Sequence, residues 1–545
     1  MNKVAHYLQE HIAGEVMAGA DARKYFSTDT SIFTLTPAMI VYPRSESDVR
    51  KTARFTWQLA ERGRVIPITA RGSGTDQSGA ALGEGIMMVF PAHMNRVLEL
   101  DGKTGSVTIE PGINYGKLQQ TLHTHNRFLP PFPSSMEYCT VGGAIGNNAS
   151  GEKTIKYGNT REYVKSLRVV LANGEVIETK RISKRELNKK LGLSTFEGEI
   201  YRSIDALLEE NNGLLKEFSL AVSKNSAGYA LSEVKRKDGS FDLTPLMVGS
   251  QGTLGIISEA TLDTVPHNPN TTLIAALLDD LQTAQEVIAE LRKLPELPCA
   301  MEVVDDKLLN FVHQYNPNQL KGILEPPFSK LVLLIEFDNH NDRTQKRMTK
   351  KAVKILQKYQ VGFRIENEAH KKEELWKIRH TAAAVVAYGE GGSKALPIIE
   401  DGIVPQDKFK EYIDSIYALF ERHGLRAAFW GHAGDANLHM QPFLDLSQVG
   451  DRQKVFKIMD EYYRMVIEMG GSTSGEHGDG RLRGPYLNPL FGNEIYAIFQ
   501  KVKHIFDPYN TMNPGVKIDV TFEAVKPLLR QEYSIDHLYD HMPRS

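Results

Sequence analysis

The sequence contains few cysteines, and this scarcity excludes several kinds of protein. Among 545 residues there are only two, Cys139 and Cys299. Two distant thiols cannot build a disulfide framework, a cysteine-based zinc site or an iron–sulfur cluster. We therefore expect a reducing location in the cytoplasm.

Charge of one sign and long apolar runs are also missing. The formal net charge is −2, from 65 basic and 67 acidic side chains, so no positive field would attract a nucleic-acid backbone. The apolar runs fall well short of the roughly 20 residues that a membrane-spanning helix needs. Glu10 and His11 interrupt the N-terminus where a secretory signal would be apolar. The sequence thus predicts neither a nucleic-acid partner nor a membrane span, while peripheral contact with a membrane stays open.

The length and the local patterns predict several packing units. A chain of 545 residues is too long for one hydrophobic core. Residues 38–270 alternate predicted strands and helices with glycine-rich loops. After the polar stretch Pro266–Asn270 the pattern changes to strand–helix units that continue to about Met469, and Ile495–Phe506 is a last predicted helix. We expect a domain boundary near residue 270.

Three glycine-rich segments lie in the first half of the chain. They are Arg71–Gly79, Gly142–Thr154 and Gly249–Ile257. Glycines let a backbone approach a ligand closely, and successive N–H groups can bind an anion. Gln77 replaces the third glycine of a Rossmann fingerprint, and Glu152 stands where a nucleotide P-loop requires lysine. Each segment alone could be an ordinary turn, but three together indicate a large dinucleotide held by loops.

Two further segments combine glycine with histidine and carboxylate. The first runs from His432 to His439 and is predicted to be a loop, and the second holds Glu476 and His477. Two histidines and a glutamate can bind zinc, manganese or iron and leave positions open for a substrate. The imidazole of His477 would then be a free base beside the metal. The alternative is that these histidines only satisfy hydrogen bonds within their loops.

A predicted helix carries one further candidate. Trp376 and Arg379 share a face of this helix. The guanidinium fork of arginine pairs well with a carboxylate. From the residues alone, however, an ordinary surface arginine is the favoured interpretation.

Together these motifs resemble the flavoproteins of the vanillyl-alcohol oxidase type, in the branch of D-lactate, glycolate-oxidase-subunit and D-2-hydroxyglutarate dehydrogenases. The resemblance extends from about Ala38 to Lys517 and also includes Pro131–Gly151, Lys156–Arg161 and Asn513–Lys517. It implies an α+β fold with a two-subdomain FAD-binding domain of the vanillyl-alcohol oxidase type and an α/β cap domain with an antiparallel sheet. The implied division is an N-terminal extension (1–37), the FAD-binding domain (38–270), the cap (271–484) and a C-terminal helical segment (485–545) that returns to the FAD domain.

The resemblance also implies roles for individual residues. The FAD pyrophosphate would be held by Arg71, Gly72, Ser73, Gly74, Thr75, Asp76, Ser78 and Gly79. The rest of the FAD would be lined by Pro133, Ser134, Ser135, Thr140, Gly143, Asn148, Ser150, Gly151 and Ile257, with Asn513 near the flavin ring. The family's metal ligands correspond to His432, His439 and Glu476, its catalytic base to His477, and its carboxylate-binding arginine to Arg379.

Departures from the family bear on the cofactor and on the fate of the electrons. The sequence has no histidine where some relatives attach FAD covalently, and we expect Cys139 to be inert packing, so the FAD is expected to be noncovalent. No cysteine cluster of an iron–sulfur domain is present, so electrons are expected to leave to a quinone or a redox protein.

The predicted reaction is the oxidation of a small D-2-hydroxy acid to the 2-oxo acid, with a divalent metal and FAD as cofactors. D-lactate is the favoured substrate, since D-2-hydroxyglutarate needs an extra cation for its distal carboxylate. One rival is an oxidase of aromatic alcohols or sugars, which would not need the two histidines and the glutamate. Another is a flavin-binding subunit that only relays electrons. A homodimer is left open.

Overall fold

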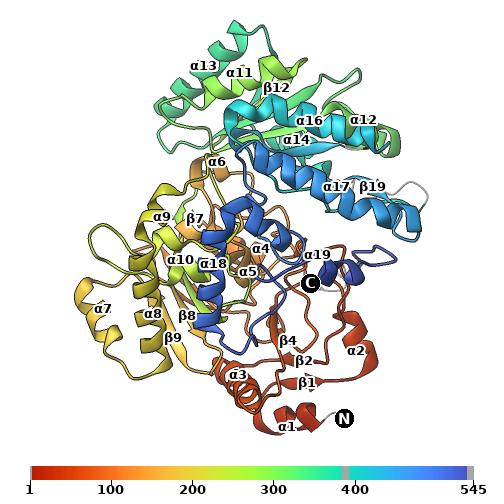
Figure 1. Ribbon diagram of the computed structural model, residues 1–545. Coiled ribbons are helices and arrows are strands. Elements are labelled where there is room, and N and C mark those ends of the chain that lie inside the picture. The colour runs from red at the N-terminus through yellow and green to blue at the C-terminus, as the bar shows by residue number, and fades with distance from the viewer. Residues whose placement is uncertain (1–2, 383–391, 427, 537–545) are drawn as a thin grey trace.

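The chain forms two lobes in a computed structural model that describes residues 3–382, 392–426 and 428–536 (Figure 1). The first lobe contains the elements up to residue 266 together with two C-terminal helices, α18 (Leu487–Phe506) and α19 (Phe522–Val525). The second lobe, which we call the cap, runs from β12 to α17. The end of the chain thus returns to the lobe in which it began.

The first sheet of the first lobe is small and mostly parallel. Its order is β1 (Glu15–Met17), β2 (Met39–Tyr42), β4 (Ile86–Val89) and β3 (Ile68–Arg71). Helix α3 (Glu46–Ala60) packs Val49 and Ala53 against Met39 and Val41 on one face, while Phe26, behind α2 (Ala20–Tyr25), covers Ile40 on the other. Burial on both faces explains why β2 reads as a continuous apolar run.

The second sheet is antiparallel and larger. Its order is β5 (Val97–Leu100), β6 (Ser106–Ile109), β10 (Ile256–Asp263), β8 (Val164–Val170) and β9 (Val176–Lys180). Gly174 has a φ of 82° in the turn between β8 and β9, so the hairpin that Asn173-Gly174 predicts is confirmed. A hydrophobic core joins one face of this sheet to α4 (Tyr115–His123), α5 (Val141–Asn147), α8 (Phe196–Glu210) and α18.

The residues 141–147 form a short helix, not the loop that their glycine content predicts. Thr140 caps this helix by accepting a hydrogen bond from the backbone N–H of Gly143. A Cβ atom on Gly142 would lie 2.6 Å from Pro111, so glycine lets the helix pack closely on the strand end beside it. Close packing, and not flexibility, explains this glycine.

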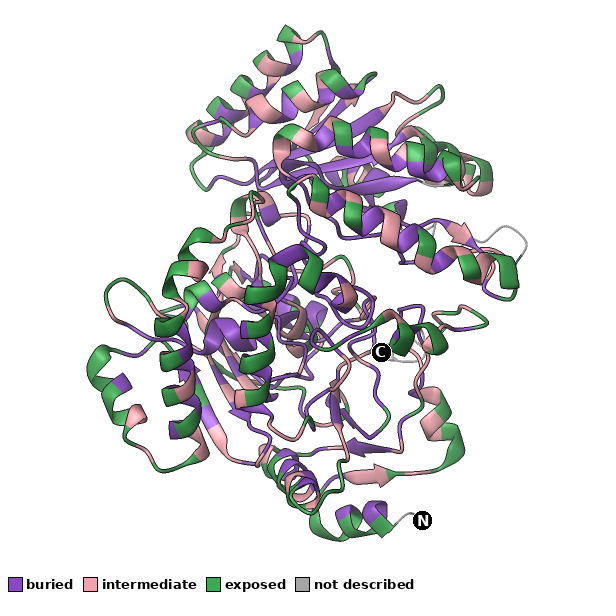
Figure 2. Ribbon diagram, in the orientation of Figure 1, coloured by how far each residue is buried: buried purple, intermediate pink, exposed green. Residues whose placement is uncertain are grey.

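The cap is a six-stranded antiparallel sheet with helices on both faces, as Figure 2 shows by the buried strands between half-exposed helices. Its order is β15 (Gly362–Glu366), β12 (Thr272–Leu278), β14 (Leu331–Phe337), β13 (Ala300–Asp305), β17 (Phe429–His432) and β18 (Asn437–Met440). One face packs against α11 (Leu281–Leu291), α13 (Asp342–Lys358) and α16 (Phe409–Arg422). The other packs against α12 (Asp306–Tyr315) and α14 (Ala369–His380). The α+β fold with an antiparallel cap sheet is therefore confirmed.

Residues 431–439 belong to a β-hairpin, so the prediction of a loop is wrong here. β17 and β18 pair in register, and a 3₁₀ turn over Ala433–Asp435 joins them. Glu302 on β13 is the cross-strand partner of His432, and Trp430 that of His439. Because side chains alternate along strands, these four side chains share the face that α14 covers in part.

Ion pairs to two buried carboxylates of the cap join the two lobes. Lys153, just before the short helix α6 (Thr154–Tyr157), pairs with Glu336 on β14 at 2.7 Å. Lys156 and Tyr157 on α6 both contact Asp338, the tyrosine hydroxyl at 2.8 Å. The segment that follows the second glycine-rich stretch is thus attached to the cap.

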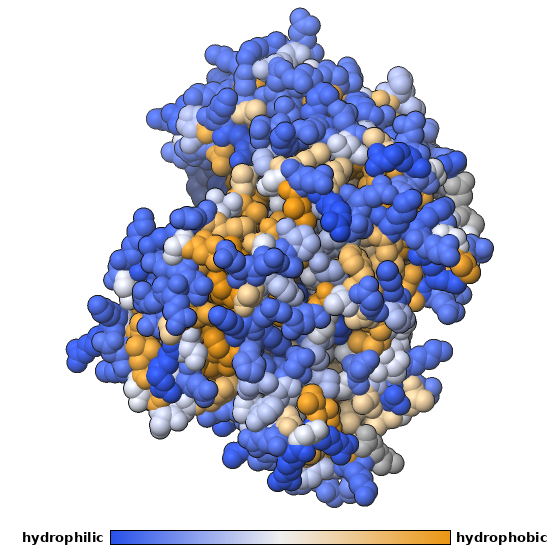
Figure 3. Space-filling model, in the orientation of Figure 1, coloured by the Kyte–Doolittle hydropathy of each residue, from blue (hydrophilic) through white to orange (hydrophobic). Residues whose placement is uncertain are grey.

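In the part of the chain that the structure covers, no helix has the length and apolar character needed to cross a bilayer. Figure 3 shows a mainly hydrophilic face with apolar side chains gathered between the lobes and around α10 (Thr244–Met247) and α18.

The hairpin that carries His432 and His439 depends on Gly431. Its φ is 147°, and a Cβ atom there would lie 2.6 Å from the carbonyl oxygen of Asn437. We predict that Gly431→Ala destabilises the cap by about 1–3 kcal/mol, seen as a lower midpoint of thermal unfolding by circular dichroism. Gly450→Ala is the control, because a Cβ atom at Gly450 meets nothing within 4 Å. Equal midpoints for the two variants would contradict the prediction.

Candidate active site

A cavity of about 690 Å³ opens between the two lobes. The first lobe lines it with the loop after β3, the segment from Pro133 to Gly151, and the loop before β10. The cap contributes Arg379, Trp430, His432 and His439, and the loop after α17 (Val449–Glu468) adds Glu476 and His477. Most residues singled out from the sequence therefore surround one space.

The loop after β3 offers unused backbone donors. Among the described hydrogen bonds, none is donated by the backbone amides of Ser73, Asp76 or Gln77. The carboxylate of Asp76 instead accepts bonds from the amides of Ser78 and Ala80 and holds the loop in shape. Free amides in a preformed loop are suited to an anion such as a pyrophosphate.

The glycines of α5 leave space for a flat ligand. A methyl group on Gly146, which lines the cavity, would meet no atom within 4 Å. The side-chain oxygen of Gln77, also in the cavity wall, has no hydrogen-bond partner in the described protein. These features fit a dinucleotide that contacts the chain through backbone and small side chains.

The predicted cofactor residues divide into two groups. Those that line the cavity are Arg71, Gly72, Ser73, Gly74, Thr75, Asp76, Pro133, Ser134, Ser135, Thr140, Gly143, Gly151 and Ile257. Those that lie behind its wall are Ser78, Gly79, Asn148, Ser150 and Asn513.

The residues behind the wall support it by hydrogen bonds. Asn513 donates to the carbonyls of Ala80 and Gln251 and so ties two cavity loops together. Arg71 itself lines the cavity, and its guanidinium donates to the carbonyls of Thr28 and Ala81. Arg71 thus also holds the loop in place.

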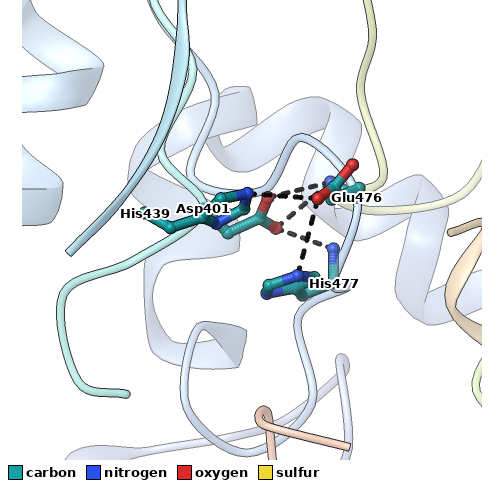
Figure 4. Close-up of side chains that lie close together, drawn as sticks. All are labelled: Asp401, His439, Glu476 and His477. Atoms are coloured by element: carbon teal, nitrogen blue, oxygen red, sulfur yellow. Dashed lines mark hydrogen bonds and ion pairs between the residues drawn. The ribbon is translucent and has the colours of Figure 1, made fainter. Parts of the chain in front are cut away.

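Three imidazoles converge on one carboxylate oxygen at the cap end of the cavity. Glu476 Oε1 lies 3.0 Å from His432 Nε2. It also lies 3.2 Å from His439 Nε2 and 3.6 Å from His477 Nε2 (Figure 4). The Nε2 atoms of His432 and His439 are 3.4 Å apart. Neighbouring ligands of a divalent cation with bonds of about 2.1 Å lie roughly 3.0–3.4 Å apart. His432, His439 and Glu476 therefore have the spacing of a metal site.

His477 differs from the other two histidines in its exposure. Its side chain is 28% exposed, against 3% for His432 and 7% for His439. It also lies farthest from Glu476 Oε1. The open side of the cluster is therefore the side on which His477 stands.

Outer carboxylates orient the three rings. His432 Nδ1 lies 2.7 Å from Glu302, and His477 Nδ1 lies 2.6 Å from Glu400. The same oxygen of Glu400 is 3.4 Å from His439 Nδ1. A carboxylate at Nδ1 favours a proton there and leaves the Nε2 lone pair toward the centre, which is how metal-binding histidines are usually held.

Two residues of the first lobe bind the second carboxylate oxygen of Glu476. Lys224 Nζ lies 2.8 Å from Glu476 Oε2, and Ser150 Oγ donates to the same oxygen. Lys224 also donates to Ser150 at 2.7 Å. Glu476 is therefore held so that only Oε1 faces the histidines.

Asp401 lies beside this cluster but is already used. Its carboxylate accepts from the amide of His477 at 2.7 Å and from the amide of Glu476 at 3.1 Å (Figure 4). It also accepts from Ser474 Oγ at 2.7 Å. We assign Asp401 to holding the loop that carries Glu476 and His477.

The buried charges favour a cation at this place. Burial lowers the pKa of His432, but the charges of Glu302 and Glu476 raise it to about 9. Burial would raise the pKa of Glu476, but His432 and Lys224 hold it well below its usual value. Ionised carboxylates thus stabilise positive charge here, whether on protonated imidazoles or on a divalent cation.

Arg379 is not a surface residue, so the interpretation favoured from the residues alone is wrong. It is 4% exposed on α14, lines the cavity and donates from Nε to Glu302 Oε2 at 2.8 Å. One carboxylate therefore contacts both this arginine and His432.

Sequence reasoning missed four residues of the site, namely Lys224, Glu302, Glu400 and Asp401. Glu400 and Asp401 follow the apolar run Leu396–Ile399, and acidic residues at the end of such a run were an available signal. Lys224 and Glu302 have no local motif, since only tertiary contacts give them a role.

Two family models match the chain. The FAD binding domain matches residues 37–180, and the C-terminal domain of FAD linked oxidases matches residues 267–516. These matches cover the amide-bearing loop and the histidine–glutamate cluster, respectively.

Curated relatives resemble the chain over most of its length. D-2-hydroxyglutarate dehydrogenase of Escherichia coli is 30% identical over 94% of this chain and 51% of its own. Glycolate oxidase subunit GlcD of Bacillus subtilis is 29% identical over 88% of each chain, and D-lactate dehydrogenase of Anaerostipes hadrus is 27% identical over 88% of this chain and 90% of its own. The chain spans about half the length of the D-2-hydroxyglutarate dehydrogenases it matches.

A solved structure shares the fold. 4-Ethylphenol oxidase from Gulosibacter chungangensis superposes with a TM-score of 0.64 at 15% identity, covering 95% of this chain and 97% of its own. The expected vanillyl-alcohol oxidase type of fold is thereby confirmed. The chain thus combines the FAD binding domain with the C-terminal domain of FAD linked oxidases, and over most of its length it is similar to D-2-hydroxyglutarate, D-lactate and glycolate enzymes.

Proposed function

We propose that the protein is an FAD-dependent dehydrogenase that oxidises a small 2-hydroxy acid to the 2-oxo acid. The observation that carries this proposal is the convergence of three imidazole nitrogens on Glu476 Oε1. This cluster lines the same cavity as a loop whose backbone amides can bind a dinucleotide. An alcohol oxidation that uses FAD alone does not require such a cluster.

Each residue of the site would have a separate role in this reaction. When bound, FAD would supply the hydride acceptor and a divalent cation would lower the pKa of the substrate hydroxyl. His432, His439 and Glu476 would hold the cation. His477 would take the hydroxyl proton on Nε2, because it stands at the open side of the cluster. Arg379 would bind the substrate carboxylate and so orient the α-carbon.

We propose zinc, manganese or iron as the cation. A donor set of two imidazoles and one carboxylate suits each of these metals. The remaining coordination positions would then be free for the hydroxyl and carboxylate oxygens of the substrate.

We propose D-lactate as the substrate ahead of D-2-hydroxyglutarate, with the D configuration taken from the relatives. Among the described residues that line the cavity, Arg379 and Arg71 are the only arginines, and there is no lysine. The guanidinium of Arg71 is bound to two backbone carbonyls. A second carboxylate would therefore lack a second fixed cation, which favours a substrate with one carboxylate.

We propose that FAD is held noncovalently and is reoxidised by a quinone or a redox protein. Cys139 lines the cavity, but burial raises the pKa of its thiol to about 12. A neutral thiol is a poor nucleophile for a flavin linkage.

The reaction predicts a specific spectroscopic response. Under anaerobic conditions D-lactate should bleach the flavin absorbance, and a metal chelator should slow this by at least about 100-fold, since the hydroxyl then keeps its high pKa. Spectra are followed with D- and L-lactate, D-2-hydroxyglutarate and benzyl alcohol. Bleaching by benzyl alcohol alone would favour an aromatic-alcohol oxidase, and a flavin that no alcohol bleaches would favour an electron-relay subunit.

The base assignment predicts the behaviour of His477→Ala. Turnover should fall by about 10²–10⁴-fold, the usual contribution of a general base, while the bound flavin keeps its absorbance spectrum. His423→Ala is the matched control, because His423 pairs with Glu461 outside the cavity. Near-normal turnover of His477→Ala would refute the assignment.

The metal assignment predicts the behaviour of His439→Ala. Its affinity for zinc, measured by competition with a chromophoric chelator, should fall by more than about 100-fold, beyond what loss of an outer hydrogen bond costs. His380→Ala serves for comparison, since His380 lies at the cavity rim with its side chain 59% exposed. Equal zinc affinities for the two variants would exclude His439 as a ligand.

A further inference from the structure

Glu302 connects the two halves of the candidate substrate site. It is 1% exposed on β13, directly across from His432 on β17. Its Oε1 lies 2.7 Å from His432 Nδ1, and its Oε2 accepts from Arg379 Nε at 2.8 Å. One rigid carboxylate therefore joins a metal-ligand histidine to the arginine that would bind the substrate carboxylate.

We propose that Glu302 is a positioning residue that sets the spacing between the metal and Arg379, and thereby selects acids with the hydroxyl on the carbon next to the carboxylate. This inference rests on the proposed function. It goes further by assigning the choice of 2-hydroxy over 3-hydroxy acids to one side chain that touches neither metal nor substrate.

The chemistry of the two contacts requires a carboxylate. A histidine that binds a metal through Nε2 carries its proton on Nδ1 and donates it. Arg379 Nε also always donates. Two donors need two acceptor oxygens, and ionised glutamate provides one for each. A glutamine of the same shape has one oxygen and one NH₂ group, so it must lose one of the two bonds.

The surroundings keep this bridge rigid. β13 lies inside the cap sheet, hydrogen-bonded to β14 on one side and to β17 on the other. Arg379 reaches Glu302 from α14, which covers the same face. Movement of either bonded partner is therefore limited by the packing of strands and helix.

Spacing decides which hydroxy acids fit. In a 2-hydroxy acid the hydroxyl and the carboxylate are on adjacent carbons, whereas a 3-hydroxy acid has one more carbon between them. The extra carbon displaces the reacting hydrogen by an ångström or more, and a misplacement of about 1 Å can cost about 100-fold in rate. A fixed distance between the metal and Arg379 therefore discriminates between the two classes.

The test compares Glu302→Gln with Glu110→Gln. Glu110 is also buried and bound to an arginine, Arg96, but belongs to the first lobe and is not among the residues that line the cavity. Two quantities are measured: zinc affinity by chelator competition, and the ratio of kcat/KM for D-2-hydroxybutyrate over D-3-hydroxybutyrate. Because these acids are isomers, general damage to the enzyme lowers both rates alike.

For Glu302→Gln we expect zinc affinity to fall about 10–100-fold and the isomer ratio to fall at least tenfold. Glu110→Gln should leave both quantities at wild-type values. An unchanged zinc affinity or an unchanged isomer ratio in Glu302→Gln, or the same fall of the ratio in Glu110→Gln, would overturn the proposal. Should Glu302→Gln not fold, Glu302→Asp keeps the buried charge and should shift both quantities in the same direction.

Failure of this inference can be told apart from failure of the proposed function. If the wild-type flavin is bleached by no hydroxy acid, the proposed function fails. If it is bleached but Glu302→Gln keeps the wild-type ratio, only the role of Glu302 fails.

Discussion

The candidate site depends on one buried carboxylate oxygen, Glu476 Oε1, and its contacts with three imidazoles. The other oxygen of Glu476 is held by Lys224 and Ser150 of the first lobe, and its backbone by Asp401. A carboxylate buried in this way is costly unless positive charge surrounds it. Of the surrounding histidines, His432 and His439 come from the cap hairpin and His477 from the loop after α17, so the two lobes together build what neither holds alone.

The fold gives each lobe a different task. The first lobe presents backbone and small residues, which suit a large ligand recognised by shape. The cap presents charged side chains from one face of a sheet, where strand register decides which residues meet. Because Glu302 and His432 are cross-strand partners, a shift of β17 by one residue would turn His432 to the other face of the sheet and separate it from Glu302.

Sequence patterns predict many of the strands and helices and the site residues that lie in motifs. They do not predict the side chains, such as Glu302, that bind those site residues. The Asn173-Gly174 turn follows from turn chemistry, and the strand–helix units after residue 270 follow from the change in apolar pattern; the structure contains both. Residues 431–439 form strands although they have few β-branched residues, because β13 offers a neighbouring edge. Glu302 was missed because a glutamate within an apolar strand resembles an ordinary exposed position until the opposing strand is known.

The attachment of α6 to the cap has a consequence for how ligands and lobes affect each other. The stretch from Gly142 to Tyr157 is cavity wall in its first part and, through Lys153, Lys156 and Tyr157, an anchor for β14 in its second. A molecule that binds the cavity wall and fixes its conformation therefore also fixes the anchor. Conversely, the contacts of the anchor with the cap hold the wall in the conformation that binds the molecule. The two effects are equal in free energy, because such linkage is reciprocal. The gain in cofactor affinity on docking of the cap and the gain in interlobe cohesion on cofactor binding would be two measures of one coupling energy.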